Sequence, residues 1–169
     1  MKKFLWMMVG IPGCGKSTWI EKQLALNGGT CISRDKIRYS LLLPYEDYFS
    51  KEDKVFEQFI QEIQTAIYNT EINPNIYIDA THLNEASREK VLSKLDLSCV
   101  EKIFLVHFVV PFEVAAARNQ ERVGRAKVPV GQIRRMYFQK DIPKAGGKFK
   151  YNIIDINENG EQTNFYSET

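Results

Sequence analysis

An apolar run near the start of the chain leads directly into a glycine-rich loop, which is followed by a helical pattern. The loop reads Gly10-Ile-Pro-Gly-Cys-Gly-Lys-Ser17, which matches the spacing G-x-x-x-x-G-K-S in full. Glycines tolerate positive φ and close approach, so the backbone N–H groups of such a loop can turn inward around a phosphate chain. Since the motif works only between a strand and a helix, it fixes the local order as strand, loop and helix.

The side chains of this loop suit a nucleoside triphosphate. Lys16 brings a charge that can reach the β- and γ-phosphates, and the Ser17 hydroxyl suits Mg²⁺, which prefers hard oxygen ligands. The helix that follows adds the positive end of its dipole. The alternative, a chance glycine turn, is disfavoured because both motif and context are complete. We expect ATP or GTP with Mg²⁺, and nucleotide contacts from Gly10, Pro12, Gly13, Cys14, Gly15, Lys16, Ser17 and Thr18.

Composition and cysteine usage favour a cytoplasmic protein. The 169 residues are 44% hydrophobic and 26% charged, which is typical of one globular domain with a core. Three widely spaced cysteines form neither a disulfide framework nor a zinc pattern, and Cys14 is better interpreted as a tolerated small residue than as a reactive thiol. The first apolar run has no small-residue cleavage site and is interpreted as a strand rather than a signal peptide. No stretch approaches the ~20 apolar residues that span a membrane, so we expect no membrane partner.

Positive charge is concentrated in the second half of the chain. From Arg118 to Lys150, ten basic residues stand against two acidic ones, which leaves a local charge of +8. Residues 155–169 carry four acidic residues and no basic one. The cationic segment fits a polyanionic second substrate or the triphosphate itself, and a solvated helical face explains it equally well.

The hydrophobic pattern predicts strands alternating with helices. Strands are expected at residues 3–9, 29–32, 75–79, 100–110 and 151–156. Helices are expected at residues 18–26, from Ser33 onward, and at 51–70, 85–97, 112–122 and about 130–140. Nearly all-apolar strands separated by helices indicate an α/β fold, with a mostly parallel sheet of about five strands covered on both faces. The last dozen residues fit either a hairpin or a frayed tail.

Three polar clusters follow predicted strands directly. They are the glycine-rich loop, Ser33-Arg-Asp35 and Asp79-Ala-Thr-His82. Ligands of parallel sheets bind at the carboxyl ends of the strands, so these clusters are expected to meet at one rim.

Asp35 and Arg38 are three residues apart on a helix that Ser33 can cap, so they share a face. Near a γ-phosphate, a carboxylate can orient and deprotonate an attacking hydroxyl, and an arginine can hold the acceptor or the phosphoryl group. The same pair is also common on helix surfaces without any catalytic role. Its position at a strand end favours catalysis.

Other candidate residues have weaker signals. Asp79 ends a strand and can support the metal ion or serve structure. His82 lacks a visible orienting partner and is interpreted as a polar rim residue, whereas His107 lies in an apolar strand and is expected near the core. Arg118 and Arg122 are one helical turn apart and can face the phosphates together.

Taken in order, these residues resemble the kinase domain of phage-type polynucleotide 5′-hydroxyl kinases. The resemblance covers roughly residues 1–140. Beyond the phosphate loop it rests on Ser33-Arg-Asp-x-x-Arg38, Asp79-Ala-Thr-His-Leu-Asn-x-x-x-Arg88, Pro111-Phe-Glu…Arg118-Asn-x-x-Arg122, and Val128-Pro followed by Ile133-Arg-x-Met-Tyr137. It implies a P-loop NTPase-type three-layer sandwich, a single kinase domain over residues 1–169 and a helical, arginine-bearing lid at about 118–145.

The resemblance also implies Mg²⁺-dependent transfer of the γ-phosphate of ATP, or another triphosphate, to the 5′-hydroxyl end of DNA or RNA. A phage-encoded protein would do this in the host cytoplasm. The implied roles are Lys16 and Ser17 on the triphosphate and Mg²⁺, Asp35 as general base, Arg38 on the acceptor phosphate, Arg122 on the transferring phosphoryl group, Arg118 on the nucleotide, Asp79 and Thr81 on the acceptor side, and Asp79 in the outer shell of the metal.

Two other classes fit the same loop. A P-loop kinase of a nucleoside or another small hydroxyl metabolite would share the loop and the arginine lid. A nucleotide-binding regulatory or toxin-like module would bind without transfer, and Asp35 with Arg38 argues against it because a pure binder needs no base. DNA or RNA, ATP or GTP, and the oligomeric state are open at this stage.

Overall fold

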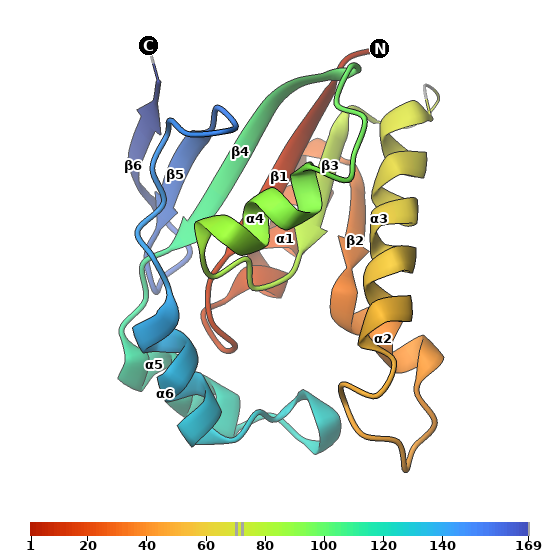
Figure 1. The fold of residues 1–169 in the computed structure, drawn as a ribbon. Coiled ribbons are helices and arrows are strands. Elements are labelled where there is room, and N and C mark those ends of the chain that lie inside the picture. Colours follow the sequence, from red (N-terminus) through yellow and green to blue (C-terminus); the bar gives the residue numbers. More distant parts are fainter. Residues whose placement is uncertain (70, 72, 169) are drawn as a thin grey trace.

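Six strands of the described residues form one sheet in the order β2-β3-β1-β4-β5-β6 (Figure 1). The computed structural model describes residues 1–69, 71 and 73–168. The strands are β1 Lys3–Val9, β2 Thr30–Ser33, β3 Asn75–Asp79, β4 Val100–Phe108, β5 Asn152–Ile156 and β6 Gln162–Ser167. Strands β1 to β5 pair in parallel, and β6 pairs antiparallel with β5. The predicted α/β fold with a mostly parallel sheet is confirmed, and the end of the chain forms the hairpin rather than a frayed tail.

Six α-helices and one short 3₁₀ helix connect the strands in the described part of the chain. They are α1 Lys16–Asn27, α2 Arg34–Leu41, α3 Glu52–Tyr68, α4 Glu85–Leu92, α5 Phe112–Gln120, η1 Gly124–Ala126 and α6 Val130–Gln139. The prediction of a helix to residue 97 is wrong, because tight turns follow Leu92 and the Gln64 side chain takes the backbone N–H of Asp96. Within the described ranges, no helix has the length and apolar character needed to cross a bilayer.

Local capping explains where two of these helices begin. Ser33 accepts a hydrogen bond from the backbone of Lys36 at 3.5 Å, and Asn84 forms a capping box with Ser87. Helix α1 has no side-chain cap, and its N-cap is Gly15 with φ of 101°. The first N–H groups of α1 are therefore available to an anion.

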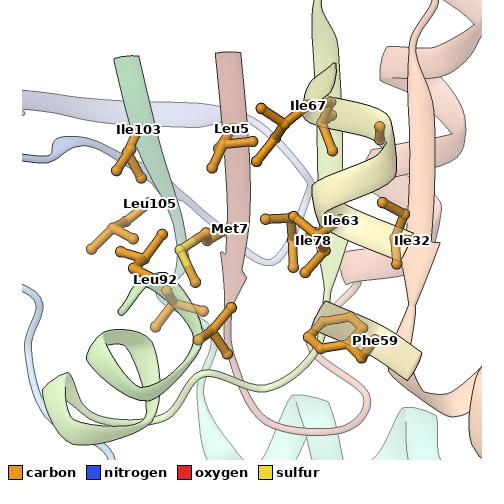
Figure 2. Close-up of a cluster of buried hydrophobic side chains, with 14 of the residues drawn as sticks. Leu5, Met7, Ile32, Phe59, Ile63, Ile67, Ile78, Leu92, Ile103 and Leu105 are labelled. Atoms are coloured by element: carbon orange, nitrogen blue, oxygen red, sulfur yellow. The ribbon is translucent and has the colours of Figure 1, made fainter. Parts of the chain in front are cut away.

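Alternating strand residues build one core on each face of the sheet. Leu5 and Met7 pack toward α3 and α4 (Figure 2), whereas Met8, the residue after Met7, belongs to the cluster with Trp19 of α1 and Ala115 of α5. Burying such an aliphatic side chain stabilises the fold by roughly 1.5–3 kcal/mol. The two clusters therefore hold the sheet between two layers of helices. The predicted three-layer sandwich is confirmed, and it brings the carboxyl ends of β1, β2 and β3 to one edge of the molecule.

Candidate active site

Two glycines of the loop after β1 are required by its shape. Gly13 has φ of +85°, and a Cβ there would lie 2.2 Å from the carbonyl oxygen of Ala115 on α5. Gly15 has φ of +101° and opens α1. The Lys16 ammonium donates to two carbonyl oxygens of the loop, each at 3.0 Å. The loop therefore packs against α5 at Gly13, and Lys16 folds back over the loop to bind its carbonyl groups. Only glycine fits at these two positions, as the motif predicts.

Cys14 packs beneath this loop and is 2% exposed. Burial raises the pKa of the Cys14 thiol, and the charge of Lys16 acts in the opposite direction. A protonated, buried thiol is a poor nucleophile. The interpretation of Cys14 as a small packing residue agrees with this environment.

A cavity of about 870 Å³ lies at the carboxyl ends of the strands. Five parts of the chain line it: the phosphate loop, helix α2, the α2–α3 loop (residues 42–51), the turn after β3 and the segment after α5. Of the predicted site residues, the cavity brings together Pro12, Gly13, Gly15, Lys16, Ser17, Thr18, Asp35, Arg38, Asp79, Thr81 and Arg122. Gly10 sits where a Cβ would come within 2.5 Å of the Cys14 sulfur, and Arg118 lies beside Gly15.

Ser17 and Asp79 fit a magnesium ion carried by a nucleotide. Both line the cavity, and Asp79 is half-buried. Burial raises the pKa of Asp79, while Lys16 and a hydrogen bond from Ser33 oppose the increase. In the described residues, no cluster of three or more His, Cys, Asp or Glu could hold a metal by itself. Mg²⁺ typically takes one or two protein oxygens and completes its shell with phosphates and water, which matches this donor set.

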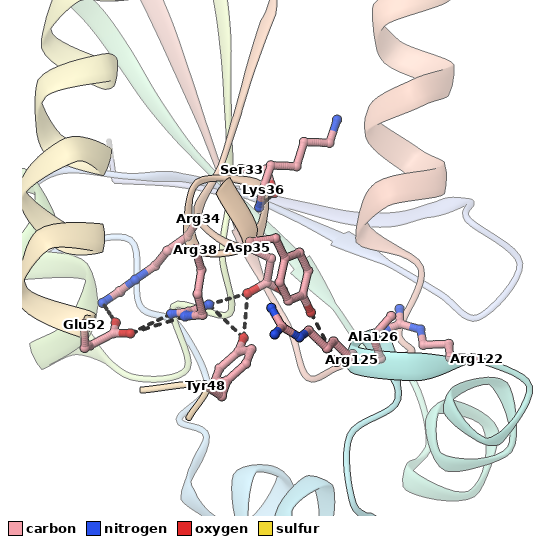
Figure 3. A network of polar contacts seen from close by, with 11 residues as sticks. Ser33, Arg34, Asp35, Lys36, Arg38, Tyr48, Glu52, Arg122, Arg125 and Ala126 are labelled. Atoms are coloured by element: carbon pink, nitrogen blue, oxygen red, sulfur yellow. Dashed lines mark hydrogen bonds and ion pairs between the residues drawn. The ribbon is translucent and has the colours of Figure 1, made fainter. Parts of the chain in front are cut away.

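A polar network holds the Asp35 carboxylate at the wall of the cavity (Figure 3). The Tyr48 hydroxyl donates to Asp35 Oδ1 at 2.6 Å, and the Arg38 guanidinium binds the same oxygen. Arg38 also donates to Glu52 Oε2 at 2.8 Å, and Arg34 pairs with the other Glu52 oxygen. Oδ1 is thus the held oxygen, while the Asp35 side chain remains 59% exposed to the cavity and solvent. This geometry presents a fixed carboxylate to a ligand.

Arg38 is enclosed by this network. It is 4% exposed, and the Tyr48 ring lies 4.3 Å from its guanidinium carbon. Its recorded partners are Asp35, Glu52 and Tyr48, so its clearest role is to orient the carboxylate. Contact with an acceptor phosphate stays a prediction for Arg38.

Three members of the network were missed by the sequence analysis: Arg34, Tyr48 and Glu52. Tyr48 lies in a loop without hydrophobic periodicity, and Glu52 carries only the ordinary signal of an acidic residue in a first helical turn. The Glu52 side chain reaches Arg38 because α3 packs against α2, which is a tertiary contact.

Arg118 and Arg122 do not share a helical face. Helix α5 ends at Gln120, so the predicted helix to residue 122 is too long. The Arg118 guanidinium donates to the Glu158 carbonyl at 2.5 Å, with its Nη1 3.8 Å from where a Gly15 Cβ would be. Arg122 lines the cavity and donates to the Ala126 carbonyl at 3.4 Å. Arg118 therefore lies beside the phosphate loop, whereas Arg122 lines the cavity from the segment after α5.

The predicted environment is wrong for His82 and confirmed for His107. The prediction of His82 as a rim residue is wrong, because it is 3% exposed and its Nδ1 lies 2.8 Å from the Met8 carbonyl. The turn after β3, which carries His82, also contacts the phosphate loop, because the Gly10 N–H donates to the Thr81 carbonyl. Burial lowers the pKa of His82 to about 4, so its ring is neutral and donates from Nδ1. His107 is near the core as predicted, with Nδ1 2.9 Å from an Asp155 oxygen.

The segment after α5 contacts helix α2 and the α2–α3 loop, on the side of the cavity that carries Asp35. The Tyr39 hydroxyl donates to the Arg125 carbonyl at 3.2 Å, and Arg125 Nη2 donates to the Leu43 carbonyl at 2.6 Å. These contacts are made by the segment predicted to be an arginine-bearing lid at about 118–145, and its function as a lid stays a prediction.

A family model described as an AAA domain matches residues 5–140, which is most of the chain. This range contains the phosphate loop, Asp35, the turn after β3 and the lid up to the end of α6.

Several solved structures have a similar fold at low sequence identity. A gluconokinase from Sinorhizobium meliloti 1021 is 16% identical with a TM-score of 0.56, over 91% of this chain and 82% of that one. A sugar kinase from Janibacter sp. HTCC2649 is 14% identical with a TM-score of 0.62, over 94% and 87% of the two chains. A chain of the Pnkp1/Rnl/Hen1 RNA repair complex is 22% identical with a TM-score of 0.66, over 82% of this chain and 44% of that one. At these identities the likeness describes the fold.

Proposed function

The chain belongs to the AAA-domain family, and on this basis we propose that it is an NTP-dependent kinase that transfers a γ-phosphate to a hydroxyl group. One observation carries the proposal: a single cavity is lined by the phosphate loop and by Asp35, whose carboxylate Arg38 and Tyr48 hold in place. A protein that only binds nucleotides needs no fixed carboxylate opposite its phosphate loop.

The chain's own residues would act mainly by alignment and charge neutralisation. The backbone of the loop, the N-terminus of α1 and Lys16 would bind the triphosphate. Ser17 would hold a bound Mg²⁺, with Asp79 in support, and the metal would supply neutralisation of the phosphate charge. Asp35 would accept the proton of the attacking hydroxyl, while Arg122 and Arg118 would stabilise charge on the nucleotide.

For the acceptor we favour the 5′-hydroxyl end of DNA or RNA. The support is the sequence resemblance over residues 1–140 and the net charge of the segment from Arg118 to Lys150, with ten basic and two acidic residues. Arg125 and Lys127 of this segment line the cavity. Arg125 also contacts the α2–α3 loop on the side that carries Asp35, which we call the acceptor side and where a polyanion would approach. The fold likeness to the chain of the RNA repair complex is compatible with the same acceptor.

A kinase of a small hydroxyl metabolite is the second candidate. Its support is the contact of Arg125 with the Leu43 carbonyl, which joins two of the segments lining the cavity, and the gluconokinase and sugar kinase folds, which match most of both chains. Ionic strength separates the two acceptors, because binding through phosphates weakens steeply with salt and binding of a neutral acceptor does not.

The direct test measures label transfer from γ-labelled ATP and GTP to 5′-hydroxyl oligonucleotides of DNA and RNA, to nucleosides and to sugar acids. We expect labelled oligonucleotides. Labelled sugars or nucleosides without labelled oligonucleotides would favour the second candidate, and nucleotide binding without any transfer would reject a kinase. Asp35→Asn should abolish transfer while nucleotide affinity stays unchanged, and retained turnover would remove Asp35 as the base.

A further inference from the structure

Phe49 presents an apolar ring to the acceptor side of the cavity. It lines the cavity and is 54% exposed, unlike Phe59 and Phe108, which are buried in the two cores. Its neighbour Tyr48 contacts it edge-to-face at 4.8 Å between ring centroids, which covers part of the ring. The packing of the core therefore does not account for Phe49, and the uncovered part of the ring is available to a ligand.

The position of this ring relative to Asp35 follows from two contacts. The Tyr48 hydroxyl lies 2.6 Å from Asp35 Oδ1, and the ring of the same side chain contacts the Phe49 ring. One aromatic side chain, Tyr48, therefore separates Phe49 from the carboxylate that would accept the proton of the attacking hydroxyl. In a nucleotide, one ribose separates the 5′-hydroxyl from the base, so a base attached to that acceptor comes within reach of Phe49.

Two cations of the predicted lid segment line the cavity, and one of them contacts the α2–α3 loop, which carries Phe49. Arg125 and Lys127 are exposed and line the cavity, and in the described part of the chain neither takes part in an ion pair. Arg125 Nη2 is anchored 2.6 Å from the Leu43 carbonyl, on the loop that carries Phe49. Glu46 is the acidic side chain that the Arg125 charge acts on, and its carboxylate is already paired with Lys51 at 2.8 Å. Because the partner of Arg125 is a neutral carbonyl and not a carboxylate, the guanidinium can still bind a phosphate.

We propose that the α2–α3 loop and the lid form a subsite for the first nucleotide of a single-stranded acceptor, in which Phe49 stacks on the 5′-terminal base and Arg125 binds the phosphate that follows it. This rests on the proposed function and narrows its substrate to a strand with an unpaired 5′ end. An exposed aromatic ring and exposed cations that line one cavity are the combination by which proteins hold single strands. Sugar acids lack the planar base, and nucleosides lack the phosphate.

The test compares two 5′-hydroxyl oligonucleotides that differ in the presence of the 5′-terminal base, one ordinary and one with an abasic first residue. We expect the wild-type KM to be roughly tenfold lower for the ordinary strand. Phe49→Ala should raise this KM to the abasic value and leave the KM of the abasic strand unchanged. Phe165→Ala is the matched control, because Phe165 is also 54% exposed but lies on β6.

Arg125→Ala gives an independent measurement. It should raise the KM of the oligonucleotide and lower the slope of log KM against log salt by about one. An unchanged KM and an unchanged slope would reject Arg125 as the residue that binds the phosphate. Unchanged nucleotide affinity and circular dichroism would show that each variant is folded.

The outcomes separate the subsite from the proposed function. If the wild-type protein labels oligonucleotides but Phe49→Ala affects the ordinary and abasic strands equally, or neither, the base subsite is rejected and the kinase stands. If the wild-type protein labels no 5′-hydroxyl oligonucleotide, the proposed acceptor fails and the subsite with it.

Discussion

The Tyr48 hydroxyl donates a 2.6 Å hydrogen bond to Oδ1 of Asp35, across the opening between the α2–α3 loop and helix α2. Burial and the hydrogen bond with Asp35 raise the pKa of Tyr48, so the phenol stays protonated and acts as a donor. Arg38 binds the same carboxylate oxygen and donates to the Tyr48 oxygen at 2.7 Å. The proposed base is therefore oriented by a loop residue and a helix residue together.

Replacing Tyr48 by Phe should lower kcat by roughly tenfold, because a hydrogen bond to a charged group contributes about 1.5 kcal/mol. Steady-state kinetics and nucleotide titration would measure it, and nucleotide affinity should not change. Tyr45→Phe is the control, since Tyr45 lies on the same loop and is 84% exposed. An unchanged kcat for Tyr48→Phe, or an equal loss for Tyr45→Phe, would contradict a role through Asp35.

Replacing Arg122 by Ala should lower kcat by a factor on the order of 10³, by analogy with arginines that neutralise charge in phosphoryl transfer. Its guanidinium lines the cavity at the lid and is exposed. Single-turnover rates at saturating nucleotide would isolate this effect from binding. Arg135→Ala, an exposed change on α6, should leave the rate unaltered, and an unaltered rate for Arg122→Ala would remove Arg122 from the site.

Replacing Arg88 by Met should reduce the free energy of unfolding by about 3 kcal/mol, because it breaks a buried ion pair. We take the low end of the range for such pairs, since the partners Asp141 and Glu85 are 34% and 37% exposed and solvent screens their charges. Arg88 itself is fully buried and also donates to the His82 carbonyl at 3.0 Å. Urea denaturation would measure the loss. Lys90→Met on the same helix should change stability by less than about 1 kcal/mol, and an equal loss for both would contradict the role assigned to Arg88.

Stability should fall between about pH 6.5 and pH 4 through His82. Its folded pKa is lowered from 6.5 to about 4, first by burial and also by the nearby cations Arg34, Arg88 and Lys16. Because the unfolded state then binds more protons in this window, the contribution is present above pH 6.5 and is lost as the pH falls, up to roughly 3 kcal/mol. His82→Asn can keep the hydrogen bond to Met8 and cannot titrate. Urea midpoints across this range should therefore vary less in the variant, and parallel curves would contradict the assignment.

Local chemistry made much of the fold predictable. The strand before the phosphate loop, the Ser33 and Asn84 caps and the spacing of Asp35 and Arg38 all depend on neighbours within a few residues. The predicted ends of α4 and α5 were too long because side chains from other elements, or turns, take the next backbone groups. The burial of His82 was missed for the same reason, since its partner Met8 lies on another strand.

The sequence by itself determined the phosphate loop, the alternation of strands and helices, and the edge of the sheet at which the site lies. These follow from backbone conformation and hydrophobic periodicity, which act over a few residues. The tertiary structure alone decided that Tyr48 and Glu52 hold Asp35 and Arg38. It also decided that Phe49 and Arg125 line the same cavity. Such contacts join an aperiodic loop, two helices and the lid, and they form only when the packing of both faces of the sheet has brought those segments together.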